Sequence, residues 1–114
     1  MNYSLVLPLP PNRANARWHW RKEKKLKDNY YMMCNVLSPR RPERLLERCN
    51  VHCDLYLWSH MDVDNAYGRL KWTLDWLTGI YIVDDSPKVI ASLTLTQHVD
   101  RKNQRLEIEL EDLR

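Results

Sequence analysis

Glycine is scarce in this sequence, and its scarcity excludes several common functional sites. Only Gly68 and Gly79 occur among the 114 residues, so the chain has no glycine-rich loop of the kind that cradles nucleotide phosphates. It also has no Gly-x-Ser-x-Gly sequence, so nothing supports a serine hydrolase built on a nucleophile elbow. The three cysteines are an odd number and do not suggest a disulfide framework.

Long apolar segments are missing as well. None approaches the roughly 20 residues that are needed to span a bilayer. The first residues lack the charged start and long apolar stretch of a signal peptide. We therefore expect a cytoplasmic protein without a membrane partner. The length fits one domain, residues 1–114, whose modest core favours an oligomer that buries more surface.

Charge is unevenly distributed along the chain. Residues 1–49 hold 11 of the 18 Lys and Arg and 4 of the 15 Asp and Glu, a net charge of +7, whereas residues 50–114 carry a net charge of −4. A basic half attracts a polyanion such as nucleic acid, and an acidic half with clustered carboxylates attracts a cation.

Hydrophobic periodicity predicts one α+β domain with a mixed sheet, two main helices on one face and the order β-α-β-α-β-β. Alternating apolar residues predict strands at residues 2–7, 50–58, 89–95 and 106–110. Helical spacing predicts helices at about residues 22–37, with Leu26, Tyr30, Met33 and Leu37 as its apolar stripe, and 64–78. A polar turn at residues 100–103 predicts that the last two strands form a hairpin.

The first candidate site is Asp62-Val63-Asp64-Asn65, between the second strand and the second helix. In extended chain, two acids two residues apart point the same way and repel each other, so the chain must separate them, protonate one or bind a cation. Oxygen ligands favour Mg²⁺, with Mn²⁺ as an alternative. A simpler interpretation remains open, in which Asp64 caps the helix and Asp62 is solvated. An EF-hand does not fit, because Ala66 stands where a ligand oxygen is required.

Two further features could complete such a site. Asp84-Asp85 follows a short apolar segment and forms either a turn or a third metal ligand, if the chain returns beside Asp64. Lys71 lies two helical turns after Asp64 and could contact a phosphate, or it pairs with Asp75 at the i+4 position.

The segment from residue 13 to 21 mixes cations with Trp18 and Trp20, a combination that suits phosphate contact and stacking on distorted bases. The alternative is a solvated loop whose tryptophans pack into the core. We predict phosphate contacts from Arg13, Arg17, Arg21, Lys24, Lys25 and Lys27. Cys49, His52, Cys53 and His60 could suggest zinc, but their spacing is loose, and both cysteines have the strand's apolar parity, which favours a core role.

Taken in order, these motifs resemble the RusA-like endodeoxyribonucleases, the Holliday-junction resolvases, and most closely their phage and prophage branch. The matching segments are Leu7-Pro8-Leu9-Pro10-Pro11-Asn12, Asn15-Ala16-Arg17-Trp18-His19-Trp20, Asp62-Val63-Asp64-Asn65, Lys71, Leu74-Asp75-Trp76-Leu77 and Asp84-Asp85-Ser86-Pro87-Lys88-Val89. The acidic motif is weak by itself, but the ordered set is specific and spans most of the chain.

The resemblance implies a homodimer that binds four-way DNA junctions and hydrolyses phosphodiesters in recombination and repair, leaving 5′-phosphate and 3′-hydroxyl ends. It implies three essential aspartates at a Mg²⁺ site, which correspond to Asp62, Asp64 and Asp85. It also implies an active-site lysine. The better-known branch has it where this chain has Gly68, and the phage branch has it at Lys71, so Lys88, also a candidate DNA contact, remains a rival.

Two alternatives stay open: a nuclease that acts on flaps or forks, and a DNA-binding protein that has the fold without catalysis. For the dimer, Trp72 and Trp76 lie one turn apart on the second helix. They either anchor the partner or are buried within the monomer.

Overall fold

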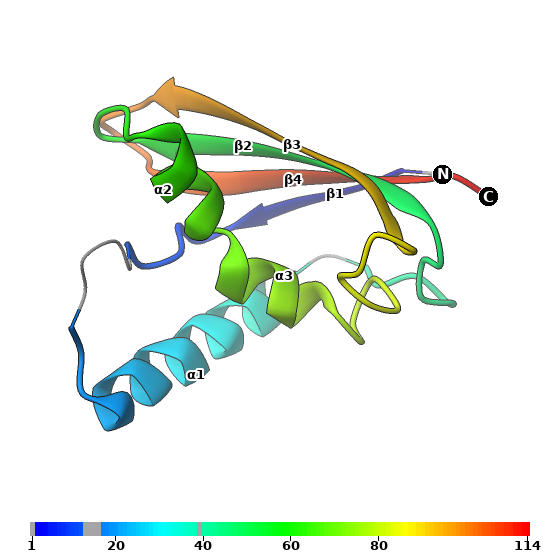
Figure 1. The fold of residues 1–114 in the computed structure, drawn as a ribbon, viewed down its shortest axis with the longest axis horizontal. Helices are drawn as coiled ribbons and strands as arrows, with labels where there is room; N and C mark the ends of the chain where they lie inside the picture. The colour runs from blue at the N-terminus through cyan, green and yellow to red at the C-terminus, as the bar shows by residue number, and fades with distance from the viewer. Residues whose placement is uncertain (1, 13–16, 39) are drawn as a thin grey trace.

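A computed structural model describes residues 2–12, 17–38 and 40–114 of the chain. Its elements are β1 (Asn2–Leu7), α1 (Trp20–Leu37), β2 (Cys49–Leu57), α2 (Val63–Gly68), α3 (Lys71–Leu77), β3 (Ile90–Val99) and β4 (Arg105–Asp112). The helices lie on one face of a four-stranded sheet (Figure 1). The predicted α+β class and mixed sheet are therefore confirmed. Within the described ranges, no helix is long and apolar enough to cross a bilayer.

The strands lie in the sheet in the order β1-β4-β2-β3. Strand β4 is antiparallel to both β1 and β2, whereas β3 pairs in parallel with β2. The prediction that the last two strands form a hairpin is wrong, because β2 lies between them. The connection from β3 to β4, residues 100–104, must cross the end of β2, a distance of about 10 Å, and it is long enough to do so. The polar turn therefore did not determine that β3 and β4 pair with each other.

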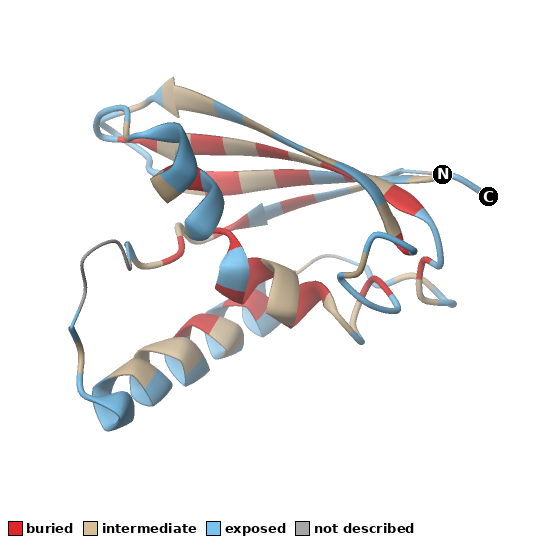
Figure 2. Cartoon of the chain, in the orientation of Figure 1, coloured by how far each residue is buried: buried red, intermediate tan, exposed pale blue. Residues whose placement is uncertain are grey.

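Alternation along the central strands builds the core. In β2 every second side chain is buried, from Cys49 to Leu57, and in β4 the same holds for Leu106, Ile108 and Leu110. Figure 2 shows this as alternating bands of buried and less buried residues along the strands. The buried set faces the helices, so the opposite face of the sheet keeps its polar side chains in contact with solvent.

Helix α1 begins at Trp20, two residues before the predicted start. The ring of His19 caps it, because His19 Nδ1 accepts a hydrogen bond from the backbone N–H of Arg21 (3.2 Å). The buried residues of α1 are Tyr30 and Cys34. Met33 and Leu37, which we expected in the apolar stripe, are exposed, since the core contact of this helix passes through Cys34 instead.

The second predicted helix is two short helices. Helix α2 ends at Gly68, a residue of low helix propensity, and α3 begins after Leu70. Trp72 and Trp76 are both buried within the chain, and Trp76 Nε1 donates a hydrogen bond to Asn35 Oδ1 on α1 (2.9 Å). The tryptophan pair is therefore not available as an anchor for a second molecule.

Candidate functional site

Asp62 and Asp64 lie where the chain leaves the sheet and enters α2. Asp62 is the N-cap residue, but its side chain makes no capping hydrogen bond, and Asp64 lies in the first turn. Both side chains are exposed. Among the described residues, neither carboxylate has a hydrogen-bond or ion-pair partner. The interpretation of Asp64 as the capping residue is thus wrong, and two carboxylates without a partner among the described residues lie two positions apart in the sequence.

Two side chains tie the region around these aspartates to other parts of the fold. Gln97 on β3 accepts a hydrogen bond from the N–H of Met61 (2.8 Å) and donates one to its carbonyl oxygen (2.9 Å). Arg69, at the end of α2, donates from Nε to the carbonyl oxygen of Pro10 (2.6 Å). Burial lowers the pKa of Arg69, the cost of holding a guanidinium between these segments. The side-chain amide of Gln97 thus fixes the backbone just before α2, and Arg69 ties the end of α2 to Pro10.

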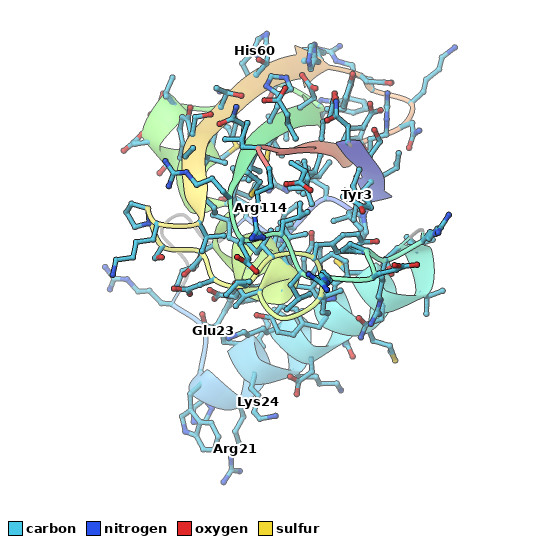
Figure 3. The ribbon with its side chains drawn as sticks, turned by 90° about the vertical axis from the view of Figure 1, so that its right-hand side faces the viewer. Tyr3, Arg21, Glu23, Lys24, His60 and Arg114 are labelled. Atoms are coloured by element: carbon cyan, nitrogen blue, oxygen red, sulfur yellow. The ribbon has the colours of Figure 1, made fainter. Side chains whose placement is uncertain are left out.

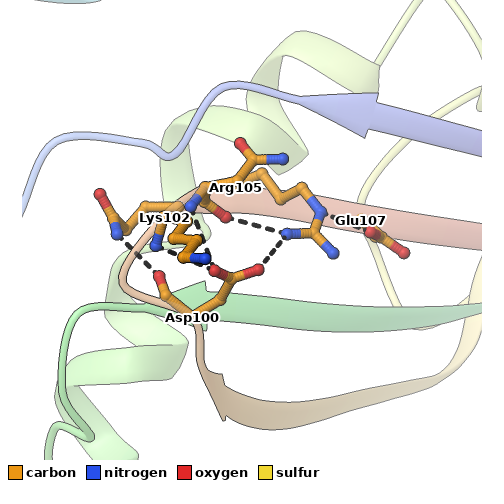
Figure 4. Close-up of polar contacts among 6 residues, drawn as sticks. Asp100, Lys102, Arg105 and Glu107 are labelled. Atoms are coloured by element: carbon orange, nitrogen blue, oxygen red, sulfur yellow. Dashed lines mark hydrogen bonds and ion pairs between the residues drawn. The ribbon is translucent and has the colours of Figure 1, made fainter.

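The turn between β3 and β4 closes the same end of the sheet (Figure 4). Asp100 Oδ1 accepts hydrogen bonds from the backbone N–H groups of Lys102 (3.0 Å) and Asn103 (3.1 Å). Its other oxygen contacts Arg105, whose Nε also donates to Glu107 (2.6 Å). The Lys102 N–H, followed by Arg105, lowers the pKa of Asp100. This turn keeps its carboxylate charged and internally paired, so Asp100 is not a free ligand.

Asp85 lies at the other end of the sheet. Strands β2 and β3 are parallel, with Cys49 beside Ile90 at their starts and Leu57 beside Val99 at their ends. Asp62 follows the end of β2, whereas Asp85 precedes the start of β3. Figure 1 shows α2 at one end of the sheet and the yellow segment around residues 80–88 at the other.

The three predicted metal ligands therefore do not meet within one chain. Nine residues of β2, at about 3.3 Å each, separate the two ends by about 30 Å. In the described part of the chain, no group of three or more His, Cys, Asp or Glu side chains could hold a metal ion. Near Asp85, Arg48 Nη1 donates to the carbonyl oxygens of Pro87 (2.8 Å) and Lys88 (2.9 Å), which fixes this segment.

The two candidate active-site lysines lie in different segments of the chain. Lys71 opens α3 and forms an i,i+4 ion pair with Asp75 (3.5 Å), although its side chain is 64% exposed. Lys88 is exposed and lies three residues after Asp85. In the sequence, Lys71 follows the Asp62 and Asp64 motif and opens a separate helix, and Lys88 follows Asp85.

The first turns of α1 carry an exposed basic and aromatic surface. Trp20, Arg21, Lys24 and Lys25 line a shallow surface hollow, and the Arg21 guanidinium lies 5.1 Å from the centre of the Trp20 ring. Figure 3 places Arg21 and Lys24 at the tip of the helix layer, on the opposite side of the molecule from His60 in the sheet layer. Lys24 pairs with Asp28 (2.7 Å), whereas Lys25 has no such partner among the described residues.

The other predicted DNA contacts differ in availability. Arg13 lies outside the described residues, and Arg17 is exposed. Trp18 is half-buried against Trp72, with ring centres 6.5 Å apart, so its ring is partly committed to the core. Lys27 is also half-buried and lies over the ring of Tyr31.

The cysteines belong to the core, as predicted. Cys34, Cys49 and Cys53 are buried free thiols, and burial raises the pKa of Cys34 to about 11 and that of Cys53 to about 12. His52 lies on the opposite face of β2, so the four residues of the zinc interpretation do not share a site.

Sequence reasoning missed a polar cluster on the open face of the sheet. The Asp54 carboxylate lies between Nε2 of His98 (2.7 Å) and Nε2 of His52 (3.2 Å). Beside it, Arg105 stacks over Tyr56 (3.7 Å to the ring centre), and Tyr56 stacks on His98. The polar residues that alternate with the buried ones in β2 could have indicated this cluster from the sequence.

Comparison with known proteins does not assign the chain to a family. The chain matches no protein-family profile and no curated protein sequence.

Proposed function

We propose that this protein is a metal-dependent endonuclease that cuts branched DNA as a homodimer. The observation that carries the proposal is the pair of exposed carboxylates of Asp62 and Asp64, which have no partner among the described residues and lie next to a backbone fixed by Gln97. Carboxylates without such partners leave their negative charge uncompensated, and a hard divalent cation neutralises it. The ordered resemblance of the sequence motifs to RusA-like nucleases supplies the reaction class and the preference for four-way junctions.

The donor set fits Mg²⁺ or Mn²⁺. All three aspartates offer only carboxylate oxygens, and their exposure leaves room for the water molecules that Mg²⁺ keeps when it binds to proteins. A divalent ion at such a site would stabilise negative charge on a phosphodiester and lower the pKa of a bound water molecule.

The separation of Asp85 from Asp62 and Asp64 makes the dimer part of the proposal. Ligand oxygens lie about 2.1 Å from Mg²⁺, so one ion cannot be reached from both ends of the same sheet. We infer that Asp62 and Asp64 of one chain meet Asp85 of the second chain. A two-fold axis then produces two equivalent sites, one at each junction of the two chains.

In this arrangement the two lysines approach the same phosphate from different chains. Lys88 arrives with Asp85, and Lys71 arrives with Asp64 and must leave its ion pair with Asp75 to donate to a phosphate oxygen. The exposed surface formed by Trp20, Arg21 and Lys25 supplies contacts to DNA away from the cut. Each of these groups binds or orients the substrate, and the aspartates hold the cation.

Mixed dimers test the proposal. Asp64→Asn and Asp85→Asn should each abolish nicking of a labelled four-way junction in Mg²⁺ while leaving junction binding intact. When the two variants are unfolded together and refolded, half of the dimers are mixed, and each mixed dimer has one intact site. Nicking should then return to about a quarter of the wild-type rate.

The control is the same experiment with Asp62→Asn and Asp64→Asn, which remove ligands from the same half-site. Mixing these two variants should restore nothing, because every mixed site lacks one ligand. If the Asp64→Asn and Asp85→Asn mixture also stays inactive while wild type refolds to full activity, a two-chain site is wrong. If wild type binds junctions but never nicks them, the chain is a DNA-binding protein without catalysis, and faster cutting of flaps or forks would identify that class of substrate instead.

A further inference from the structure

A second charged hollow lies outside the features described so far. It has a volume of about 610 Å³ and lies beside the start of β1 and the end of β4. Arg40, Arg41 and Arg44 contribute to its wall, together with the half-buried ring of Tyr3. Pockets of this volume accommodate small organic ligands or a nucleotide.

None of the three guanidinium groups forms an ion pair with a carboxylate of the described residues. Among the described residues, no ion pair includes any of them, and Arg41 makes only a long hydrogen bond to Asn35 Oδ1 (3.5 Å). The nearby arginine that is paired is Arg114, which contacts Glu47 (2.6 Å). Three guanidinium groups without an ion-pair partner among the described residues repel each other, so an anion that enters the hollow gains favourable contacts with all of them.

Two acidic residues also line the hollow and oppose anion binding. Asp112 already accepts a hydrogen bond from the backbone N–H of Arg114 (3.1 Å), whereas Glu43 has no partner among the described residues. Three arginines against two carboxylates leave a net positive wall, and Glu43 is the group that weakens it.

The segment that carries the arginines is anchored to the core. Leu46 is buried, its N–H donates to the carbonyl oxygen of Tyr81 (2.8 Å), and its own carbonyl accepts from the N–H of Val83 (3.0 Å). This links the arginine segment to the strand-like residues just before Asp85. The hollow and Asp85 therefore lie at the same end of the sheet, because Asn2, Asp112 and Cys49 share that end with Ile90.

We propose that the hollow formed by Arg40, Arg41 and Arg44 binds a phosphate group. Guanidinium groups match phosphate oxygens in charge and in hydrogen-bond geometry. The phosphate belongs either to a DNA backbone or to a small phosphate compound. The DNA source rests on the proposed function, in which a strand passes Asp85 and would place a phosphate at this end of the sheet.

The test measures binding alone, in EDTA, so that it does not depend on nuclease activity. In one arm, a labelled four-way junction is titrated between about 50 and 200 mM salt with wild type, Arg40→Gln, Arg44→Gln and Arg114→Gln. Loss of Arg40 or Arg44 should each reduce the slope of log affinity against log salt by about 1. Arg114→Gln removes the same charge close by, but its guanidinium is already paired, and it should leave the slope unchanged.

The second arm titrates the same proteins with pyrophosphate by isothermal calorimetry. Binding to wild type that is lost in Arg40→Gln and Arg44→Gln, with unchanged DNA slopes, assigns the hollow to a small phosphate compound. Changed DNA slopes assign it to the DNA backbone. Glu43→Gln should strengthen whichever binding is found. The proposal fails if Arg40→Gln and Arg44→Gln behave like Arg114→Gln in both arms. A wild type that never cuts DNA would contradict the proposed function without affecting this result.

Discussion

At the scale of single residues, the hydroxyl of Tyr30 joins three separate parts of the chain. It donates to the carbonyl oxygen of Pro8 (3.1 Å), so the hydroxyl of Thr73, 2.9 Å away, must be the donor in the second bond. Both side chains are buried, and burial raises the pKa of Tyr30. One side chain of α1 thereby fixes α3 and the proline segment that follows β1.

Removing this hydroxyl should cost stability without changing shape. Tyr30→Phe leaves the Pro8 carbonyl and the Thr73 hydroxyl without their partner, which should lower the free energy of unfolding by about 1–3 kcal/mol. Urea denaturation followed by tryptophan fluorescence measures the change. The control is Tyr31→Phe on the half-buried neighbour, which should change stability by less than about 0.5 kcal/mol. Equal effects of the two changes would show that the buried hydroxyl of Tyr30 contributes no more to stability than the half-buried hydroxyl of Tyr31.

A second residue-scale prediction separates Trp18 from Trp20. Trp20 is 63% exposed, and base–aromatic stacking contributes about 1–3 kcal/mol per base, so Trp20→Ala should weaken junction binding about tenfold with little loss of stability. Trp18→Ala should instead lower the free energy of unfolding, because its ring packs on Trp72. Electrophoretic mobility shifts and urea denaturation of both variants test this. Unchanged junction affinity in Trp20→Ala would show that the Trp20 ring does not contact DNA.

At the scale of elements, the sequence predicted where strands and helices lie better than how they pair. Alternation located β2 within one residue at each end, because one face of that strand is buried along its whole length. The partner of β4 was not predictable from local signals, since the polar residues 100–104 serve equally well as a hairpin turn or as a connection across β2. The break between α2 and α3 comes after a single glycine, Gly68, whereas helical spacing predicted one helix through residues 64–78.

For the candidate site too, the sequence predicted which residues are involved better than how they are arranged in space. The residue types and positions of Asp62, Asp64 and Asp85 were evident from the sequence, and so was the basic surface at the start of α1. The distance between Asp85 and the other two aspartates was not evident from the sequence. A β-α-β order favours parallel strands, which place the segment before β3 at the start of β2. The alternative in which Asp85 returns beside Asp64 conflicted with that rule. The arginine hollow was missed because Tyr3 and Asp112 reach it from the opposite ends of the chain.

At the scale of the whole molecule, stability should fall in alkaline solution. Burial raises the pKa of Cys34 to about 11 and that of Cys53 to about 12, and it also raises the pKa of Cys49. These thiols stay neutral in the folded protein, whereas in the unfolded chain they ionise near their ordinary pKa of about 9. The unfolded state therefore releases protons first, and ionisation favours it as the pH rises.

The free energy of unfolding should accordingly be constant below about pH 8, decline from about pH 9, and continue to fall through the folded pKa values near 11 and 12. Each buried thiol contributes a slope of up to about 1.4 kcal/mol per pH unit in that range. Urea denaturation between pH 7 and 11 measures it, and Cys53→Ala should flatten the curve although it lowers stability overall. Val51→Ala, a truncation on the same buried face of β2 without a titrating group, should give a curve parallel to wild type. If Cys53→Ala and Val51→Ala decline equally with pH, the Cys53 thiol is not a source of the alkaline instability, and the ionisation of Tyr30 on unfolding becomes the principal cause.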